Sequence, residues 1–341
     1  MATNFIGIHM RRHLFSIITL VGATIATNAM AQSREQNWQR CASENTDLKI
    51  AGCTAIIQSK REIPENLAIA FYDRGNAYQD THQYNMAIRD YDEAINLKPS
   101  FAEAFDNRGN AFYFERQYER AINDYTEAIK LKPGYAKALN NRGVAYHDEG
   151  HYDLAIQDYD QAIKLKPSFA EALNNRGLAY EAMGEHDRAI QDYDQAIRLN
   201  PGLALPFDDR GIAYRHQGQP DRAIEDFNRA IEIKPNYAFA LYNRALAYED
   251  KGEYDRAIED YDQAIRFDPN YANAFYHRGN SYSHKGDYEH AIRDYSRAIE
   301  LKPDYADAFY RRGIAEQSNG NSAAGVNDIA TAKRFGFQTD K

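Results

Sequence analysis

Histidine and cysteine are the side chains in this sequence that could support catalysis or metal binding. His147, His216, His277 and His284 are scattered along the chain, and we expect none of them to have a fixed carboxylate partner. No G-x-S-x-G, H-E-x-x-H or phosphate-binding glycine loop occurs. We therefore expect a non-catalytic protein with no metal and no cofactor. An enzyme, or a subunit that completes one, is the disfavoured alternative.

The first 31 residues have the features of a secretory signal peptide. Arg11 and Arg12 form a basic start, an apolar run extends from residue 14 to 27, and Ala29-Met30-Ala31 is a small-x-small cleavage signal. An uncleaved anchor is the alternative, but the run is shorter than the roughly 20 residues of a membrane span. We expect cleavage after Ala31, a periplasmic or secreted mature protein, and no stable membrane insertion of it.

The two cysteines, Cys41 and Cys53, favour a disulfide. An even number of cysteines in an exported chain suggests pairing, and two buried free thiols are the alternative. Two sulfur ligands without clustered histidines cannot fill a tetrahedral zinc site. The formal net charge is −9 and becomes −11 when the two arginines of residues 1–31 are removed. Such an acidic chain is a poor partner for nucleic acid, because that binding depends on phosphate neutralisation.

A fixed period of 34 residues organises the rest of the chain. Prolines stand at positions 99, 133, 167, 201, 235, 269 and 303. With proline at position 32 of a unit, eight units cover residues 68–101, 102–135, 136–169, 170–203, 204–237, 238–271, 272–305 and 306–339. Apolar residues at positions 4, 8 and 11 share one helical face, and those at 17, 20, 21, 24 and 28 share a second. Each unit is therefore predicted to be a helical hairpin.

Glycine at position 8 is present in seven of the eight units, inside the first predicted helix. Because glycine costs a helix roughly 1 kcal/mol against alanine, we expect close approach of a neighbouring helix there. Glycines such as Gly150 and Gly184 are expected to end the first helix.

The repeated residues resemble the tetratricopeptide repeat (TPR) family. Glycine at position 8, tyrosine at 11, alanine at 20 and 27, an aromatic at 24 and proline at 32 match its pattern from residue 68 to about 339. The resemblance implies an all-α fold, a right-handed superhelical solenoid of helix-turn-helix repeats. Residues 32–67 are then a degenerate hairpin that carries the disulfide, and the last unit is an atypical cap.

An arginine occupies position 7 in all eight units, where the family more often has leucine, and an aspartate occupies position 23 in all eight. We expect a ladder of Arg–Asp pairs that joins the first helix to a second helix. A row of arginines that binds an anionic ligand is the alternative. The predicted structural ladder includes Arg108, Arg142, Arg176, Asp124, Asp158 and Asp192.

In TPR arrays, positions 2, 5, 6, 9, 12 and 13 of the first helix line the concave groove where ligands usually bind. The predicted peptide-binding residues are Asn107, Asn140, Asn141, Asn174, Asn175, Asn243, Asn110 and Asn280, with an apolar strip of Val144, Leu178, Ile212 and Leu246. The asparagines resemble the ladder that holds peptide main chain in some TPR superhelices, since an amide both donates and accepts. Asparagines that contact only water are the alternative.

The resemblance thus implies a protein–protein interaction scaffold with a protein partner. The groove positions carry more acids than bases, including Asp80, Asp106, Asp148, Asp208, Asp209 and Asp250. We therefore expect the ligand to be an extended, neutral-to-basic polypeptide segment. A glycan that stacks on Tyr72, Tyr242, Tyr276 and Tyr310 is the alternative. The sequence predicts neither the partner's identity nor the oligomeric state.

Overall fold

The computed structural model describes residues 33–338, which form two compact units divided between Leu165 and Lys166. The predicted signal peptide lies outside the described residues. The regular structure of the described part is helical throughout, with no strand in it. None of its helices combines the length and apolar character that a membrane crossing requires.

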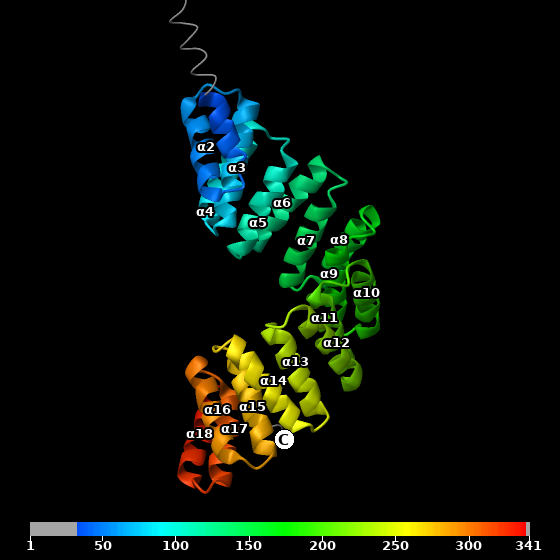
Figure 1. Ribbon diagram of the computed structural model, residues 1–341, viewed down its shortest axis with the longest axis vertical. Helices are drawn as coiled ribbons and strands as arrows, with labels where there is room; N and C mark the ends of the chain where they lie inside the picture. The colour runs from blue at the N-terminus through cyan, green and yellow to red at the C-terminus, as the bar shows by residue number, and fades with distance from the viewer. Residues whose placement is uncertain (1–32, 339–341) are drawn as a thin grey trace, which may run out of the picture. The chain divides into compact units, whose positions relative to one another are not determined.

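The first unit begins with a short hairpin and continues with three longer ones (Figure 1). Residues 33–41 are helical and precede α2 (Thr46–Ser59). The longer hairpins are α3 (Pro64–Asp80) with α4 (Tyr84–Leu97), α5 (Ala102–Phe114) with α6 (Tyr118–Leu131), and α7 (Ala136–Asp148) with α8 (Tyr152–Leu165). The first helix of each hairpin packs on the second helix of the hairpin before it.

The second unit contains five hairpins stacked by the same rule. They are α9 (Ala170–Ala182) with α10 (His186–Leu199), α11 (Ala204–His216) with α12 (Pro220–Ile233), α13 (Ala238–Asp250) with α14 (Tyr254–Phe267), α15 (Ala272–His284) with α16 (Tyr288–Leu301), and α17 (Ala306–Ser318) with α18 (Ser322–Arg334). The predicted fold class, an all-α solenoid of helical hairpins, is confirmed. From α5 to α17, each first helix begins at the first residue of a predicted repeat.

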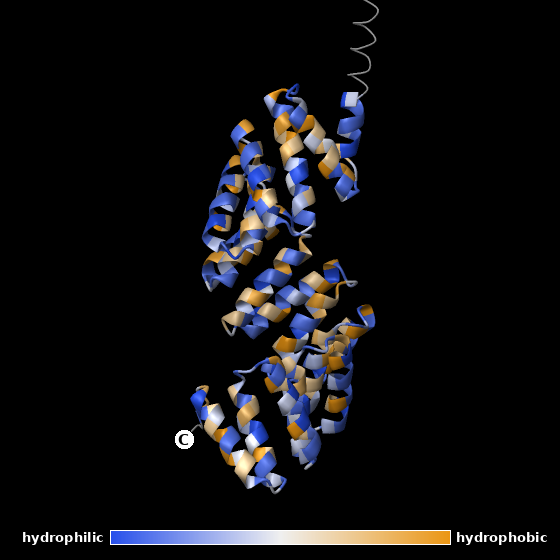
Figure 2. Ribbon diagram, turned by 90° about the vertical axis from the view of Figure 1, so that its left-hand side faces the viewer, coloured by the Kyte–Doolittle hydropathy of each residue, from blue (hydrophilic) through white to orange (hydrophobic). Residues whose placement is uncertain are grey.

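The core is a repeated arrangement of small and aromatic side chains. Alanines at positions 20 and 27 and the aromatic ring at position 24 are almost completely buried, as Ala155, Ala162 and Tyr159 illustrate. Figure 2 shows hydrophobic and hydrophilic residues interleaved along the helices.

The glycine at position 8 makes room for this ring, so the neighbouring helix approaches it closely, as expected, through a side chain rather than through its backbone. A Cβ atom added to Gly143 would lie 2.6 Å from Cε1 of Tyr159, and the position 8 glycine of most other repeats has the same close contact with its ring. The last repeat differs, because a Cβ on Gly313 would lie 2.8 Å from the backbone oxygen of Gly325. Backbone approach therefore explains the glycine only in the last repeat.

The turn inside each hairpin requires a left-handed residue. Gly150 and Gly184 have φ of +80° and +75°, and the later repeats carry glycine there too. The first two repeats place His82 and Arg116 at the same position, both with φ of +58°. This conformation is costly for a side chain with a Cβ atom, so these two turns are strained.

Candidate functional site

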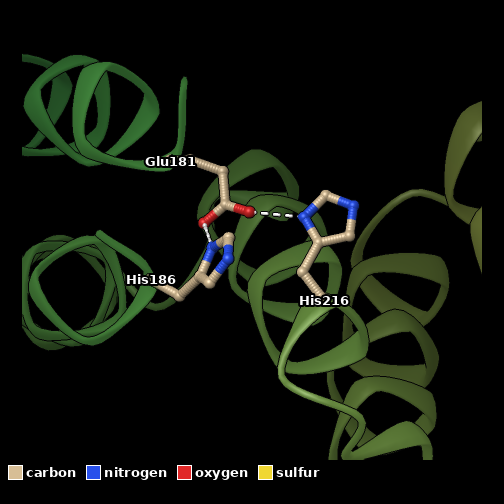
Figure 3. Close-up of side chains that lie close together, drawn as sticks. All are labelled: Glu181, His186 and His216. Carbon is tan, nitrogen blue, oxygen red and sulfur yellow. Dashed lines mark hydrogen bonds and ion pairs between the residues drawn. The ribbon is translucent and has the colours of Figure 1, made fainter. Parts of the chain in front are cut away.

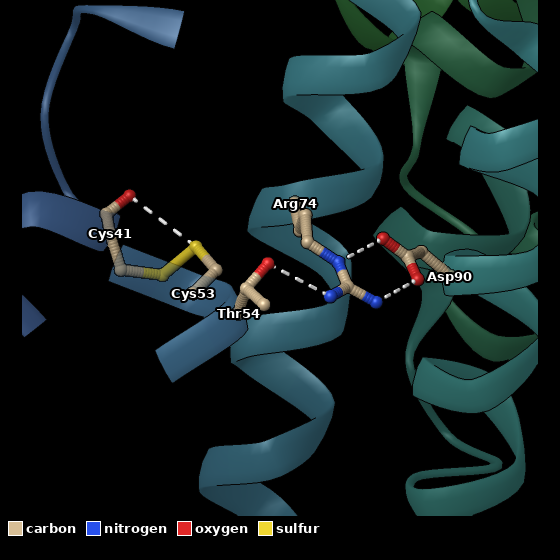
Figure 4. Close-up of a disulfide and its surroundings, with 5 residues drawn as sticks. All are labelled: Cys41, Cys53, Thr54, Arg74 and Asp90. Atoms are coloured by element: carbon tan, nitrogen blue, oxygen red, sulfur yellow. Dashed lines mark hydrogen bonds and ion pairs between the residues drawn. A yellow bond between two sulfur atoms is a disulfide. The ribbon is translucent and has the colours of Figure 1, made fainter. Parts of the chain in front are cut away.

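The disulfide predicted between Cys41 and Cys53 is present and joins the first helical segment to α2 (Figure 4). Both cysteines are fully buried, and Ile56 and Ala70 pack with them. The bridge therefore fixes the hairpin that covers α3, the first helix of the first repeat.

The structure brings every arginine at position 7 together with the aspartate at position 23 of its own repeat. Nε and Nη2 of each arginine donate to the two carboxylate oxygens of its aspartate at 2.6–2.9 Å. The pairs are Arg74–Asp90, Arg108–Asp124, Arg142–Asp158, Arg176–Asp192, Arg210–Asp226, Arg244–Asp260, Arg278–Asp294 and Arg312–Asp328. The hydrogen bond from Arg142 to Asp158 raises the pKa of the guanidinium. Because each guanidinium is paired with an aspartate of its own repeat, the alternative of an arginine row that binds an anionic ligand has no support.

A further partner of these arginines comes from the preceding helix. Nη1 of Arg142 donates to Thr126 Oγ1 at 2.9 Å, and Nη1 of Arg244 donates to Asn228 Oδ1 at 2.6 Å. Both acceptors occupy position 25 of the repeat before. In the first repeat, Thr54 of α2 takes this role and accepts from Arg74 at 3.0 Å (Figure 4). Each of these arginines thus connects three helices, an arrangement that the sequence interpretation missed.

The asparagines at position 6 also make contacts between repeats. Nδ2 of Asn107 donates to Tyr72 Oη at 3.0 Å and to Asn76 Oδ1 at 2.8 Å. Nδ2 of Asn141 donates to Asp106 Oδ1 at 2.9 Å and to Asn110 Oδ1 at 3.1 Å. All four acceptors belong to the preceding repeat. The amide nitrogens are therefore occupied, and the carbonyl oxygen is the polar atom that remains on each side chain.

The other predicted groove asparagines differ in exposure. Asn140, Asn174 and Asn243 are buried, whereas Asn175 is half-buried. Nδ2 of Asn174 donates to Asp209 at 2.8 Å, and Nδ2 of Asn243 donates to Asp208 at 3.1 Å. Their burial keeps Asn140, Asn174 and Asn243 away from direct contact with a ligand.

The residue at position 9 mainly contacts the aromatic side chain at position 24. Asn76, Asn110 and Asn280 accept hydrogen bonds from the hydroxyl groups of Tyr91, Tyr125 and Tyr295 at 2.8, 2.8 and 2.9 Å. The predicted apolar strip is recessed: Val144, Leu178 and Ile212 are half-buried, and Leu246 is 8% exposed. Leu178 cannot accept a hydrogen bond, and the buried hydroxyl of Tyr193 in the same repeat has no partner among the described residues.

Three of the acids predicted to charge the groove are buried. Asp106 is fully buried and pairs with Lys137 at 3.3 Å. Burial raises the pKa of Asp208 to about 6 and that of Asp209 to about 7. The exposed acids at groove positions include Asp80 and Asp148. Any negative surface for a ligand therefore depends on the exposed acids alone.

The expectation that the histidines have no fixed carboxylate partners is wrong for His147, which contacts Asp148 at 3.2 Å, and for His216 and His277. His216 Nδ1 lies 2.5 Å from Glu181 Oε1, and His277 Nδ1 lies 3.3 Å from Glu249 Oε2. His186, which the sequence interpretation did not single out, also contacts Glu181, at 2.9 Å (Figure 3). Glu181 and His216 are 35 residues apart, one more than the repeat period, as are Tyr113–Asp148 and Arg215–Asp250. This spacing is the signal that could have found the contact.

Comparison with known proteins agrees with the repeat architecture. A family model for the TPR repeat matches residues 75–114, 116–150, 143–184, 211–252, 247–286 and 279–320, and a tetratricopeptide repeat model matches residues 170–203. The chain belongs to the tetratricopeptide repeat family. No curated protein sequence matches it significantly.

Solved structures show the same fold. A tetratricopeptide repeat protein from Parabacteroides merdae is 21% identical with a TM-score of 0.58, and the match covers 76% of this chain and 99% of that one. The Cut9–Hcn1 hetero-tetramer of the APC/C matches with 13% identity and a TM-score of 0.59, over 85% of this chain and 57% of that one. YrrB, described as a TPR protein with an unusual peptide-binding site, is 26% identical over 54% of this chain and 95% of its own, with a TM-score of 0.44.

Proposed function

We propose that the protein is an exported, non-catalytic scaffold that binds an extended, neutral-to-basic polypeptide segment along the first helices of its repeats. Membership of the TPR family supports a role in protein–protein interaction. The disulfide between Cys41 and Cys53 supports an oxidising compartment, where such bonds persist. Mass spectrometry of the mature protein should find Gln32 as its first residue if the signal peptide is removed as expected.

The oriented amides of Asn107 and Asn141 carry the proposal. Each amide nitrogen is hydrogen-bonded to two acceptors of the preceding repeat. The side chains are thereby held in one rotamer, and no hydrogen bond within the described residues uses their Oδ1 atoms. A fixed acceptor costs little entropy when it binds. Two such acceptors in successive repeats suit the N–H groups of an extended main chain.

Charge supports a neutral-to-basic ligand. Asp80, Asp148, Glu171 and Asp250 are exposed at groove positions. Asp148 also accepts from Tyr113 of the repeat before, which holds its side chain, whereas the charge of Asp250 is already paired with Arg215. Fixed surface carboxylates attract lysine and arginine side chains and repel acidic segments.

Peptide display tests the proposal directly. A library of random linear peptides is selected against the purified protein, and fluorescence anisotropy then measures the affinity of the selected peptides. Loss of two hydrogen bonds in the Asn107→Ala/Asn141→Ala variant should weaken binding by roughly five- to a hundredfold. Asn85→Ala is the matched control, because Asn85 is an exposed asparagine on α4. Unchanged affinity in a double variant that remains helical and folded would contradict the proposal.

A glycan ligand finds less support in the tyrosines. The ring of Tyr242 lies 4.9 Å from that of Tyr271, and the ring of Tyr276 lies 5.0 Å from that of Tyr305. Burial raises the pKa of Tyr242 to about 12. These rings pack against one another at tilted angles, which reduces the aromatic surface available to a sugar.

A further inference from the structure

Three metal-ligating side chains converge where the fourth and fifth repeats meet (Figure 3). Glu181 is near the end of α9, His186 is the first residue of α10, and His216 is the last residue of α11. The two Nδ1 atoms contact different oxygens of the same carboxylate, at 2.9 Å for His186 and 2.5 Å for His216. One donor atom from each residue lies within 4.8 Å of the other two.

The same three repeat positions converge at other junctions, but with different chemistry. Where the second and third repeats meet, Tyr113 contacts both Tyr118 and Asp148. Where the sixth and seventh meet, the positions hold Glu249, Tyr254 and His284, and the last two rings stack at 4.8 Å. The position of His186 is tyrosine in five other repeats, namely at Tyr84, Tyr118, Tyr152, Tyr254 and Tyr288. In the described part of the chain, only the junction of repeats four and five brings a carboxylate and two imidazoles together.

The environment leaves the carboxylate available to a cation. Within residues 33–338, the partners of Glu181 are the two histidines, and no lysine or arginine pairs with it. The nearby cation Arg188 is bonded to Glu185 and Tyr180 instead. By contrast, Glu249 accepts from Tyr261 and Ser281 as well as His277.

Access and distance also suit an ion. The Glu181 side chain is 12% exposed, whereas those of His186 and His216 are 30% and 47% exposed. The carboxylate thus lies beneath two imidazoles that solvent can reach. In a tetrahedral zinc site, with bonds of about 2.1 Å, the ligand atoms are about 3.4 Å apart. Small rotations of the two imidazoles would bring their nitrogens from hydrogen-bonding distance to that spacing.

We propose that Glu181, His186 and His216 form a binding site for a divalent transition-metal ion such as Zn²⁺. The ion replaces the two hydrogen bonds between the imidazoles and the carboxylate. Each imidazole gives up the Nδ1 proton that it donates to the carboxylate and binds the ion through Nδ1 with a proton on Nε2, so that two neutral histidines and one carboxylate complete the set. This set favours zinc, copper or nickel over calcium or magnesium, which prefer oxygen ligands. The remaining coordination position is left to water or to a donor from a partner.

Such an ion would connect two repeats. Glu181 and His186 belong to the fourth repeat and His216 to the fifth, so coordination joins α9 and α10 to α11. Binding to the folded state alone raises the unfolding temperature, and the stabilisation grows with the logarithm of the ligand concentration once that exceeds Kd. The proposal therefore has two readouts, metal affinity and thermal stability, and it does not depend on a polypeptide ligand.

The test is titration of the purified protein, without a polyhistidine tag, with Zn²⁺ in a calorimeter. One zinc ion per chain is expected, together with a higher unfolding temperature in its presence. His186→Tyr restores the tyrosine of the other repeats, so it should fold and yet lose at least about tenfold in affinity. Glu181→Gln should lose affinity similarly, with almost no change in shape.

His284→Ala is the matched control, because it removes a histidine from the equivalent place at the junction of repeats six and seven. It should leave both the zinc affinity and the zinc-dependent stabilisation unchanged. Absence of zinc binding to the unaltered protein would overturn the proposal. Equal affinity in the unaltered protein, His186→Tyr and Glu181→Gln would also overturn it, because the ion would then bind elsewhere.

Discussion

Replacing Arg142 and Asp158, singly and together, tests whether the Arg–Asp pairs are a structural ladder. The two side chains form two hydrogen bonds of 2.7 Å, and they are 18% and 4% exposed. A charge buried to this degree is costly without its partner. Arg142→Leu leaves the Asp158 carboxylate uncompensated and should cost about 3 to 5 kcal/mol of unfolding free energy. Asp158→Leu should cost slightly less, because the guanidinium keeps Thr126 as an acceptor and reaches solvent.

The double variant is expected to be much more stable than the sum of the single changes. Two leucines of similar volume remove both desolvation costs along with the attraction, so the net change should lie within about 1 to 2 kcal/mol of the unaltered protein. The coupling energy should therefore be several kcal/mol. The exposed pair Arg229–Glu232 supplies the control, since its loss should cost less than about 1 kcal/mol.

Urea denaturation followed by circular dichroism measures these free energies. Repeat arrays can unfold in parts, so hydrogen exchange of peptides from α7 and α8 should show where protection is lost. Single changes that each cost less than about 1 kcal/mol, or that add up in the double variant, would refute the reasoning. The arginines would then be surface residues that lie beside aspartates without energetic coupling.

Three other predictions follow from single features of the repeats. Arg116→Gly should raise stability in urea denaturation by about 1 kcal/mol, because it relieves a left-handed turn residue with φ of +58°, and a loss would contradict the strain. Tyr193→Phe should be neutral or should stabilise the protein by about 1 kcal/mol, because the buried hydroxyl of Tyr193 has no partner in the described structure. Tyr125→Phe should destabilise the protein, because it removes a hydrogen bond of 2.8 Å, and thermal unfolding would distinguish the two variants. Asp209→Asn should remove a pH dependence. Since burial raises the pKa of the folded-state carboxyl to about 7, the unaltered protein should lose about 3 kcal/mol as pH rises from 5 to 8, and identical denaturation profiles for the two proteins would contradict this.

The fold could be predicted from sequence because its signals repeat in register. A proline every 34 residues and an arginine and aspartate 16 residues apart in every unit define both the hairpin and its internal pairs. The glycine at position 8 predicted close approach of a neighbouring helix, but not that an aromatic side chain makes the contact. Helical periodicity places the glycine and the position 24 ring on the core side without showing that they touch.

The exposure of the predicted groove residues was harder to predict from the sequence, because it depends on contacts between repeats. Helical geometry places Asn141 and Asn174 on one face, yet Asn174 is buried and Asn141 uses its nitrogen for the preceding repeat. The acceptors at position 25 were missed because their residue types vary. Asp92, Thr126 and Asn228 share only a side-chain oxygen, which composition does not reveal.

The direction of the arginine contacts has a consequence for how the chain can be assembled. Arg74 donates to Thr54 in the disulfide-bonded hairpin that precedes it. Arg142, Arg244 and Arg312 likewise donate to the residue at position 25 of the preceding repeat. The last unit differs, because Ala330 at its position 25 has no side-chain oxygen. A repeat that emerges during synthesis or export therefore finds its acceptor on a helix that has already emerged. The chain can fold vectorially from its N-terminal end, with the cross-linked hairpin as the template for the first repeat.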